Sequence, residues 1–292
     1  MNDSSPTPSR VLLTGASSQL GHALLRQLDG QHVHVHALSR QPAGAGLDWL
    51  DWLDWHRGDL REGWPAIEAD VAISFGPLQA LADALAALPK APVRRLVATS
   101  SMSAESKRDS PVAEDRALSQ SLRDAEAALR TQCERLGIGW TLLRPTMIWG
   151  LGIDRNLTPV AHRAMRTRLF PWPVGRGLRQ PVHAADVAEA AWRALHDDAA
   201  LGQALEIGGG ERLPIDAMFK RVRGSLPVRT LPVPVPRPLL ALVSALLPGL
   251  RGAISRVDQD LVADNTRLQA LLGIEPRGFR PVAANWRAER QL

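Results

Sequence analysis

Residues 11–21, VLLTGASSQLG, join a short apolar run to a turn and then to the start of a helical pattern. A strand, a glycine turn and a helix in this order are typical of a dinucleotide-binding loop, because the helix N-terminus presents N–H groups to a pyrophosphate. Gly15 permits the tight turn, and Gly21 lets the helix pack closely against the strand. The spacing predicts a phosphate loop formed by Thr14, Gly15, Ser17, Ser18, Gln19, Leu20 and Gly21.

Ser18 departs from the usual glycine pattern of such loops. It takes the place of the middle glycine of a GxxGxxG loop, where the backbone comes closest to phosphate. A glycine at this turn can also serve the turn geometry alone, so a strand–helix turn without a cofactor remains the alternative.

The end of the second strand indicates which dinucleotide is bound. An NAD site needs a carboxylate there to accept from the ribose hydroxyls, whereas an NADP site needs an arginine. The chain has Leu38, Ser39 and Arg40 at this point and no carboxylate. Arg40 can pair with a 2′-phosphate and Ser39 can donate to it, so we predict NADP(H), with NAD as the alternative. A solvated arginine at a strand end is the other interpretation.

Strand-like and helical segments alternate along the first two thirds of the chain. The expected strands cover residues 11–13, 32–37, 70–75, 96–98, 140–143 and 204–207. The expected helices include 20–28, 78–88, a long one capped by Ser110 with Pro111 in its first turn, and one to residue 196 that opens with a capping box of Asp186 and Glu189. This alternation predicts an α/β fold with a doubly wound parallel sheet of the Rossmann type.

The composition of the sequence changes after Gly150, where Arg, Pro and Trp become frequent. A regular strand and helix pattern returns at Pro181. We therefore expect an NAD(P)-binding domain formed by residues 10–150 and 181–208. Residues 151–180 and 209–292 form a small C-terminal substrate lobe in this prediction.

Composition excludes several classes of protein. The 292 residues carry a net charge of only +5, and the basic residues are scattered without interleaved aromatic residues, which disfavours nucleic-acid binding. The longest apolar run, residues 239–247, is too short to span a membrane, and residues 1–10 have no apolar stretch that would form a secretory signal. The single cysteine, Cys133, lies on the apolar stripe of its helix and excludes a disulfide framework. We expect a cytoplasmic monomer or homodimer.

Further motifs occur in the order typical of one family. Gly58-Asp59-Leu60, Phe75-Gly76-Pro77, Thr99-Ser100-Ser101, residues 144–150 (RPTMIWG), residues 181–188 (PVHAADVA) and residues 207–211 (IGGGE) follow the phosphate loop. Together they resemble the short-chain dehydrogenase/reductase superfamily, in its extended and atypical epimerase/dehydratase branches, from about Val11 to Pro281. The resemblance implies cofactor contacts from Asp59, Leu60, Phe75, Gly76, Pro77 and Pro145.

The catalytic core of that family is not matched. The family uses a Tyr as acid/base with a Lys four residues later, and this chain contains no Tyr at all. One register on the long helix puts Ser119 and Arg123 at those positions, and the other, anchored on Glu126, puts Leu118 and Leu122 there. We take Ser119 and Arg123, together with Ser101 as a hydrogen-bonding group for a substrate oxygen, as the candidate catalytic residues.

Substrate contacts are expected from Met102, from His183 and from an arginine-rich segment. No acidic residue occurs between Asp154 and Asp186, so the arginines of this segment, among them Arg155 and Arg176, create a positive field. In the resembling family this segment borders the substrate cleft, which suits an anionic small molecule such as a nucleotide sugar. A solvated basic face or a subunit contact is the alternative for the arginines, and a His that caps the following helix is the alternative for His183.

The sequence indicates no function for two other features. His32, His34 and His36 alternate along one strand, but no Cys or acidic residue is placed nearby, so no metal site is expected. Residues 48–55, DWLDWLDW, repeat with a period of three that fits neither strand nor helix. We expect a surface loop partly packed on the sheet edge.

The sequence as a whole predicts an NAD(P)-binding oxidoreductase or epimerase/dehydratase with a non-standard active site that acts on an anionic small molecule. The alternative is a catalytically silent NAD(P)H-binding sensor or assembly subunit, which the missing Tyr favours.

Overall fold

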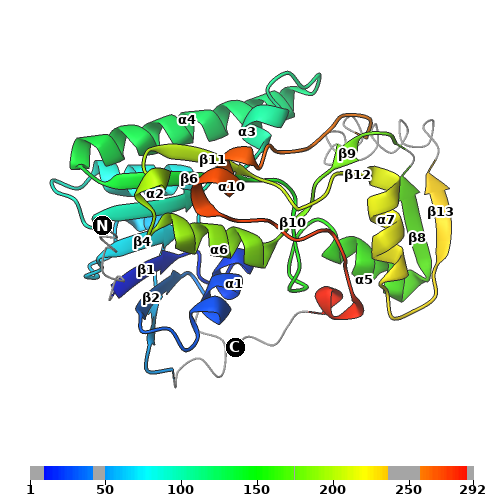
Figure 1. The fold of residues 1–292 in the computed structure, drawn as a ribbon, viewed down its shortest axis with the longest axis horizontal. Helices are drawn as coiled ribbons and strands as arrows, with labels where there is room; N and C mark the ends of the chain where they lie inside the picture. The colour runs from blue at the N-terminus through cyan, green and yellow to red at the C-terminus, as the bar shows by residue number, and fades with distance from the viewer. Residues whose placement is uncertain (1–9, 42–49, 174, 236–256, 288–292) are drawn as a thin grey trace.

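The computed structural model describes residues 10–41, 50–173, 175–235 and 257–287. Within these ranges the chain forms a large unit built on a parallel sheet and a smaller lobe beside it (Figure 1). The doubly wound α/β fold predicted from the sequence is confirmed.

Every pairing in the main sheet is parallel, and the strand order reverses direction between β1 and β4, as in a Rossmann fold. Its strands, in spatial order, are β11 (Gln203–Ile207), β6 (Gly139–Pro145), β5 (Arg95–Thr99), β4 (Val71–Ser74), β1 (Arg10–Thr14), β2 (His34–Ser39) and β3 (Leu53–Arg57). Crevices open at the carboxyl end of such a sheet, on either side of the reversal.

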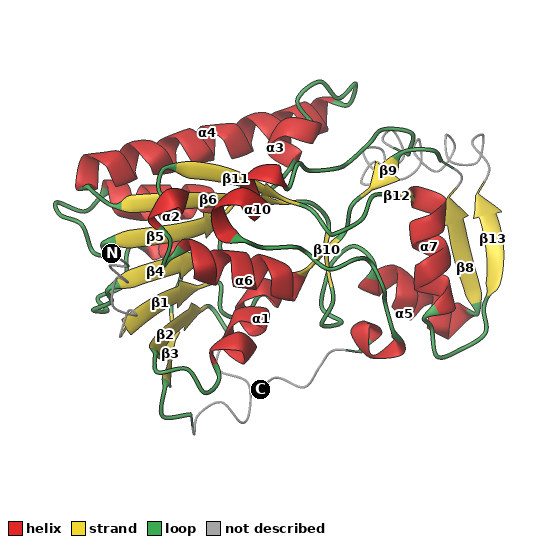
Figure 2. Cartoon of the chain, viewed as in Figure 1, coloured by secondary structure: helices red, strands yellow, loops and turns green. Residues whose placement is uncertain are grey.

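Helices cover both faces of the sheet (Figure 2). The elements packed on this sheet are α1 (Gln19–Leu28), η1 (Leu60–Glu62), α2 (Leu78–Ala86), α3 (Ser103–Ser106), α4 (Ala113–Leu136), α6 (Ala184–Ala194), η2 (Asp198–Ala200) and α10 (Thr266–Leu272). Apolar residues of α1, α6 and α10 share one buried cluster with Val11 and Leu13 of β1. Those of α2 and α4 share another with Leu12, which points to the opposite face because side chains alternate along a strand.

The smaller lobe has its own apolar core. It gathers Phe170, Phe279 and Trp286, all fully buried. Its elements, with the short strands that lead into it, are β7 (Ile148–Trp149), α5 (Thr158–Thr167), β8 (Leu169–Pro173), β9 (Leu178–Arg179), β10 (Val182–His183), β12 (Leu213–Pro214), α7 (Ile215–Gly224), β13 (Leu231–Val235) and η4 (Ala283–Trp286). No helix in the described part of the chain is long and apolar enough to cross a membrane. The apolar run of residues 239–247 lies outside the described residues.

Three expectations about local structure are wrong. Residues 53–55 of the DWL repeat belong to the edge strand β3, so the expected loop is wrong there, whereas the expected packing on the sheet edge is observed, since Leu50, Trp52 and Trp55 pack against the α1-side core. Helix α4 begins at Ala113, because the Ser110 hydroxyl accepts from the Val112 N–H ahead of the helix. Helix α6 has His183 as its N-cap, and no Asp186–Glu189 capping box forms.

Gly15 is held against the neighbouring strand end. Its φ of +73° lies in the left-handed region, and a Cβ there would lie 2.8 Å from the Phe75 carbonyl carbon and 2.9 Å from the Gly76 nitrogen. Both atoms belong to backbone and have little freedom to move. The turn therefore requires glycine for folding, whatever the cofactor adds.

We expect Gly15→Ala to lower the free energy of unfolding by about 2–4 kcal/mol, from backbone strain together with this clash. The matched control is Gly30→Ala, which has nearly the same φ, +75°, and no atom within 4 Å of the added Cβ. It should cost only about 1–2 kcal/mol, from strain alone. Urea unfolding of both variants measures the difference. Equal losses of unfolding free energy would show that the close approach to the Phe75 and Gly76 backbone adds no cost.

Candidate active-site cavity

A cavity of about 930 Å³ opens at the carboxyl ends of β1, β4, β5 and β6. Four predicted segments meet at its wall: the phosphate loop, the turn after β4, the serine segment after β5 and the turn after β6. The predicted site residues that line it are Ser17, Ser18, Gln19, Leu20, Phe75, Gly76, Pro77, Ser101, Met102, Pro145 and Arg155. Those that the structure does not bring to this wall are Thr14, Gly15, Gly21, Ser39, Arg40, Asp59, Leu60, Ser119, Arg123, Arg176 and His183.

The phosphate loop brings the N-terminus of α1 to the cavity. Ser18 is the N-cap, and its hydroxyl accepts from the Gly21 N–H at 3.1 Å. The serine in place of the middle glycine therefore fixes the helix start. Thr14 has an inward structural role, because its buried hydroxyl donates to Ser74 Oγ at 2.8 Å.

Two arginines lie near the end of β2, and both are close to the Asp59 carboxylate. The Arg40 side chain is 70% exposed, and its Nε lies 3.9 Å from Asp59 Oδ2. Arg61, which the prediction missed, lies 3.5 Å from the same oxygen. Ser39 is not available as predicted, because its buried hydroxyl donates to Ser17 Oγ. Leu60 is likewise a core residue and not an exposed contact.

The two registers of the long helix differ in which residue they bring to the cavity. Ser119 is fully buried and donates to the Ala104 carbonyl at 2.6 Å, and Arg123 donates to Ser119 Oγ at 2.7 Å and to the same carbonyl. These two residues join α4 to α3 and do not line the cavity, so their positions do not support the catalytic assignment, which stays a prediction. Leu122 of the other register lines the cavity, whereas Leu118 is 43% exposed.

Ion pairs hold α4 in the position that brings Leu122 to the cavity. Arg144 on β6 forms a paired contact with the buried Glu126 of α4, and its Nη1 lies 3.1 Å from Glu105 of α3. The Glu126 hydrogen bond is the main cause that raises the pKa of Arg144. The two helices and the strand are thus joined through one guanidinium beside the cavity.

The cavity wall contains groups that the sequence analysis did not select: His22, Ser100, Lys107 and Arg179. The Ser100 hydroxyl is buried and has no hydrogen-bond partner among the described residues. Lys107 Nζ lies 2.9 Å from Asp115 Oδ1, and both side chains are largely buried. The sequence did contain a signal for Lys107, because it is one of only three lysines in the chain and follows Ser101 by six residues. Burial is the main cause that lowers the pKa of His22.

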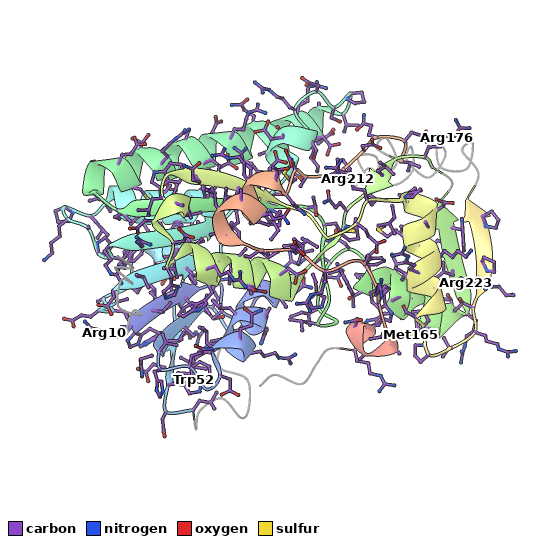
Figure 3. All side chains as sticks on the ribbon, in the orientation of Figure 1. Arg10, Trp52, Met165, Arg176, Arg212 and Arg223 are labelled. Atoms are coloured by element: carbon purple, nitrogen blue, oxygen red, sulfur yellow. The ribbon has the colours of Figure 1, made fainter. Side chains whose placement is uncertain are left out.

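The arginine-rich segment is only partly directed at the cavity. Arg155 and Arg179 line it, and buried Arg179 donates to the Gln259 carbonyl at 2.7 Å. Arg176 is exposed at the top of the smaller lobe (Figure 3), where its backbone N–H donates to Asp258. The expectation that Arg176 contacts substrate in this cavity is therefore not supported by its position.

His183 lies at a second cavity, of about 710 Å³, together with Trp149, Glu211 and Arg277. Its Nδ1 accepts from the Ala185 N–H at 3.1 Å, so the capping alternative for His183 is the one observed. Burial, followed by the nearby Arg277, lowers the pKa of His183 to about 4. A neutral ring is consistent with acceptance of that hydrogen bond.

One premise of the metal prediction is wrong. The sequence analysis placed no acidic residue near the alternating histidines, but β3 lies beside β2 and brings Asp54 to His34 and His36. His32 precedes β2 and is exposed.

No protein-family profile matches the chain. A 4-hydroxy-2-methyl-3-oxo-4-farnesyl-3,4-dihydroquinoline-1-oxide ketoreductase from Stigmatella aurantiaca is 28% identical over 209 residues, and the match spans 62% of each protein. Among solved structures, MoeE5 in complex with UDP-glucuronic acid and NAD gives a TM-score of 0.70 at 20% identity, covering 94% of this chain and 97% of that one.

The UDP-glucuronic acid 4-epimerase of Bacillus cereus, also solved with its substrate and NAD, gives 0.70 at 15% identity, covering 96% of this chain and 97% of that one. A short-chain dehydrogenase/reductase superfamily protein from Agrobacterium tumefaciens with bound NAD gives 0.66 at 15% identity, with 93% of each chain covered. This chain has the fold that these solved proteins share, which include a nucleotide-sugar epimerase and a protein of the short-chain dehydrogenase/reductase superfamily. The resemblance inferred from the motifs is confirmed.

We expect the low pKa of His183 to make folding stability depend on pH. The unfolded chain protonates this His near pH 6.5 and the folded chain only near pH 4. Its stabilising contribution is therefore complete above about pH 6.5 and falls by about 2 kcal/mol as the pH drops to 4.5. His183→Asn, which keeps a capping oxygen, should remove this part of the slope in urea unfolding between pH 7 and 4.5. Comparison with the parent chain cancels the opposite contribution of Asp186, whose pKa is raised by burial. If His183→Asn left the pH dependence of the unfolding free energy unchanged, the assignment of that dependence to His183 would be contradicted.

Proposed function

We propose that this chain is an NADP(H)-dependent oxidoreductase of the short-chain dehydrogenase/reductase type. The observation that carries the proposal is the cavity at the carboxyl edge of the sheet, where the α1 N-terminus meets the turns after β4, β5 and β6. Solved proteins of this fold bind NAD, including MoeE5 and the Agrobacterium protein.

The residues present fit a dinucleotide. The α1 N-terminus offers N–H groups to the pyrophosphate. Arg40 at the end of β2 and Arg61 of η1 both lie beside Asp59, where an adenosine 2′-phosphate would bind, and the buried Ser100 hydroxyl would gain a partner when the cavity is filled. The two arginines, with no carboxylate at the end of β2 itself, favour NADP(H) over NAD(H).

The bound cofactor would supply the hydride. The chain's own residues would hold the substrate oxygen and deliver a proton. Ser101 Oγ accepts from the Ser103 N–H at 3.1 Å, and this leaves its own proton to donate to a substrate oxygen. Lys107 lies in the cavity wall, where its amino group can donate to an alkoxide or stabilise its charge. Asp115 holds it in place, and the Ser110 hydroxyl donates to Asp115. We assign the acid role that the absent Tyr would fill to Lys107.

The substrate we propose is an anionic small molecule with a carbonyl or secondary hydroxyl. Lys107 and Arg155 give the cavity positive charge, and Met102, Leu122, Met147 and Ile148 give it an apolar wall. A nucleotide sugar satisfies both, and several neighbours of the fold are described with UDP-sugars. The ketoreductase relative supports carbonyl reduction as the reaction.

For cofactor choice, we expect calorimetric titration to give tighter binding of NADP(H) than of NAD(H). Arg40→Ala should weaken NADP(H) binding by about 1.5–3 kcal/mol, because a charge-assisted contact is lost, and leave NAD(H) binding nearly unchanged. Arg94→Ala is a matched control, since Arg94 is exposed at the opposite, amino end of β5. Equal affinities for the two dinucleotides would contradict the assignment of Arg40.

For the reaction, we expect single-turnover NADPH oxidation with a panel of carbonyl compounds, including oxidised nucleotide sugars, to depend on Lys107. Lys107→Met should slow it by about a hundredfold, as expected when general-acid help is lost, and Ser101→Ala should slow it as well. Lys90→Met, an exposed lysine outside the cavity, is the control. Turnover that is unaffected by both cavity variants would place the chemistry elsewhere.

A second candidate is an NAD(P)H-binding protein without turnover. The observation that favours it is Leu122 in the cavity wall, since neither register of the long helix supplies a Tyr and a Lys there. Tight NADPH binding with no oxidation across the panel would select this candidate.

A further inference from the structure

Four polar side chains gather on one face of the β2–β3 edge, away from the dinucleotide cavity. His34 and His36 are two residues apart on β2, so both point to the same side of the sheet. The parallel register sets Asp54 of β3 opposite His36 and His56 opposite Leu38. The opposite face at Val35 and Ala37 is buried under α1 and α6, which leaves the polar face turned toward solvent.

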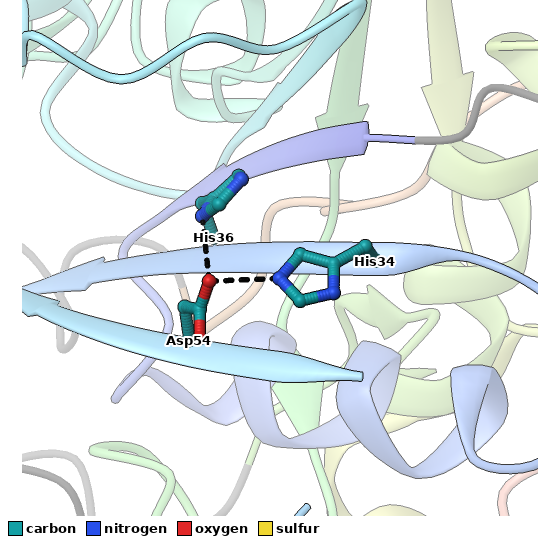
Figure 4. A group of neighbouring side chains, drawn as sticks. All are labelled: His34, His36 and Asp54. Carbon is teal, nitrogen blue, oxygen red and sulfur yellow. Dashed lines mark hydrogen bonds and ion pairs between the residues drawn. The ribbon is translucent and has the colours of Figure 1, made fainter. Parts of the chain in front are cut away.

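The side chains of His34, His36 and Asp54 converge (Figure 4). His34 Nε2 lies 2.8 Å and His36 Nδ1 lies 3.4 Å from the same oxygen, Asp54 Oδ2. One ligand atom from each of these residues lies within 4.8 Å of the others. His56 Nε2 lies a further 3.1 Å from His36 Nδ1.

The surroundings leave room and suitable charge for an ion. His34 is 35% exposed, His36 16% and Asp54 55%, so solvent reaches the point where the three meet. Arg10 lies beside His34 in the β1–β2 register, and its guanidinium is paired with Glu68 at 2.8 Å and with Asp70 at 3.8 Å. Those two carboxylates compensate the positive charge that Arg10 would otherwise direct at a bound cation.

We propose that His34, His36 and Asp54 form a binding site for one first-row divalent metal ion, with Zn²⁺ as the best match. The ligand atoms are His34 Nε2, His36 Nδ1 and Asp54 Oδ2, and water or His56 Nε2 completes the coordination. Two imidazole nitrogens with one carboxylate suit Zn²⁺ and its borderline neighbours, whereas Mg²⁺ and Ca²⁺ select oxygen ligands.

The geometry is close to that of such a site. Ligands about 2.0–2.1 Å from a tetrahedral ion lie about 3.3–3.4 Å from one another. The His36–Asp54 separation already has this value, and the His34–Asp54 hydrogen bond has to open by roughly half an ångström. The ligands come from two adjacent strands, so the ion would cross-link the edge strand β3 to β2.

The test uses tag-free chain stripped with EDTA and titrated with Zn²⁺ in a calorimeter. We expect one Zn²⁺ per chain with a Kd below about 10 μM, weakened at least about tenfold by His36→Ala and by Asp54→Asn. His32→Ala is the matched control, an exposed histidine next to the site that should leave the Kd within about twofold. Asp54→Asn keeps the side-chain shape, so it reports on ligation even where His36→Ala loosens the strand.

A second readout is thermal. Zn²⁺ at roughly a hundred times its Kd for the parent chain should raise the Tm of the parent chain and of His32→Ala by about 5 °C, and raise that of the two ligand variants by at most about half as much. Zinc binding by the parent chain no tighter than by His36→Ala and Asp54→Asn would overturn the proposal, as would an equal loss in His32→Ala. NADP(H) affinity is not expected to change in these variants, so this result is independent of the proposed function.

Discussion

The contact between the turn after β1 and the end of β4 is the constraint on which the site depends. Gly15 lies so close to the Phe75 and Gly76 backbone that no side chain fits between them. This contact sets the start of α1 beside the turn after β4, across the point where the strand order reverses. The carboxyl edge of the sheet thereby gains a cavity with a helix N-terminus on one side and polar strand ends on the other.

A second constraint fixes the far wall of that cavity. Arg144 joins Glu126 of α4 to Glu105 of α3, and the buried Ser119–Ala104 hydrogen bond joins the same two helices. Removing one partner of a largely buried ion pair leaves an uncompensated charge, so this group holds α4 in a single register. That register presents Leu122 to the cavity, and it places Asp115 where it can hold Lys107.

The cavity has two distinct walls. On one side lie the glycine turn after β1 and the capped N-terminus of α1, with Arg40 near the end of β2. On the other side lie Leu122, the Ser100 hydroxyl, which has no hydrogen-bond partner among the described residues, and Lys107, which is paired with Asp115. In the proposed function, cofactor binding and turnover would therefore depend on separate sets of residues.

The sequence by itself determined six of the seven strands of the main sheet, the helices that alternate with them and the glycine turn after β1, because strand and helix periods and glycine turns are local signals. It also determined that no phenol takes part, since composition alone excludes one. It missed β3, because three-residue spacing hides the alternation that appears once Leu53 packs on the core. The choice of Leu122 over Arg123, the place of Lys107 in the cavity and the meeting of Asp54 with His34 were decided only by the tertiary structure. Each depends on how a helix or strand is aligned with a distant neighbour, and that alignment is set by packing and buried charge rather than by any spacing within one segment.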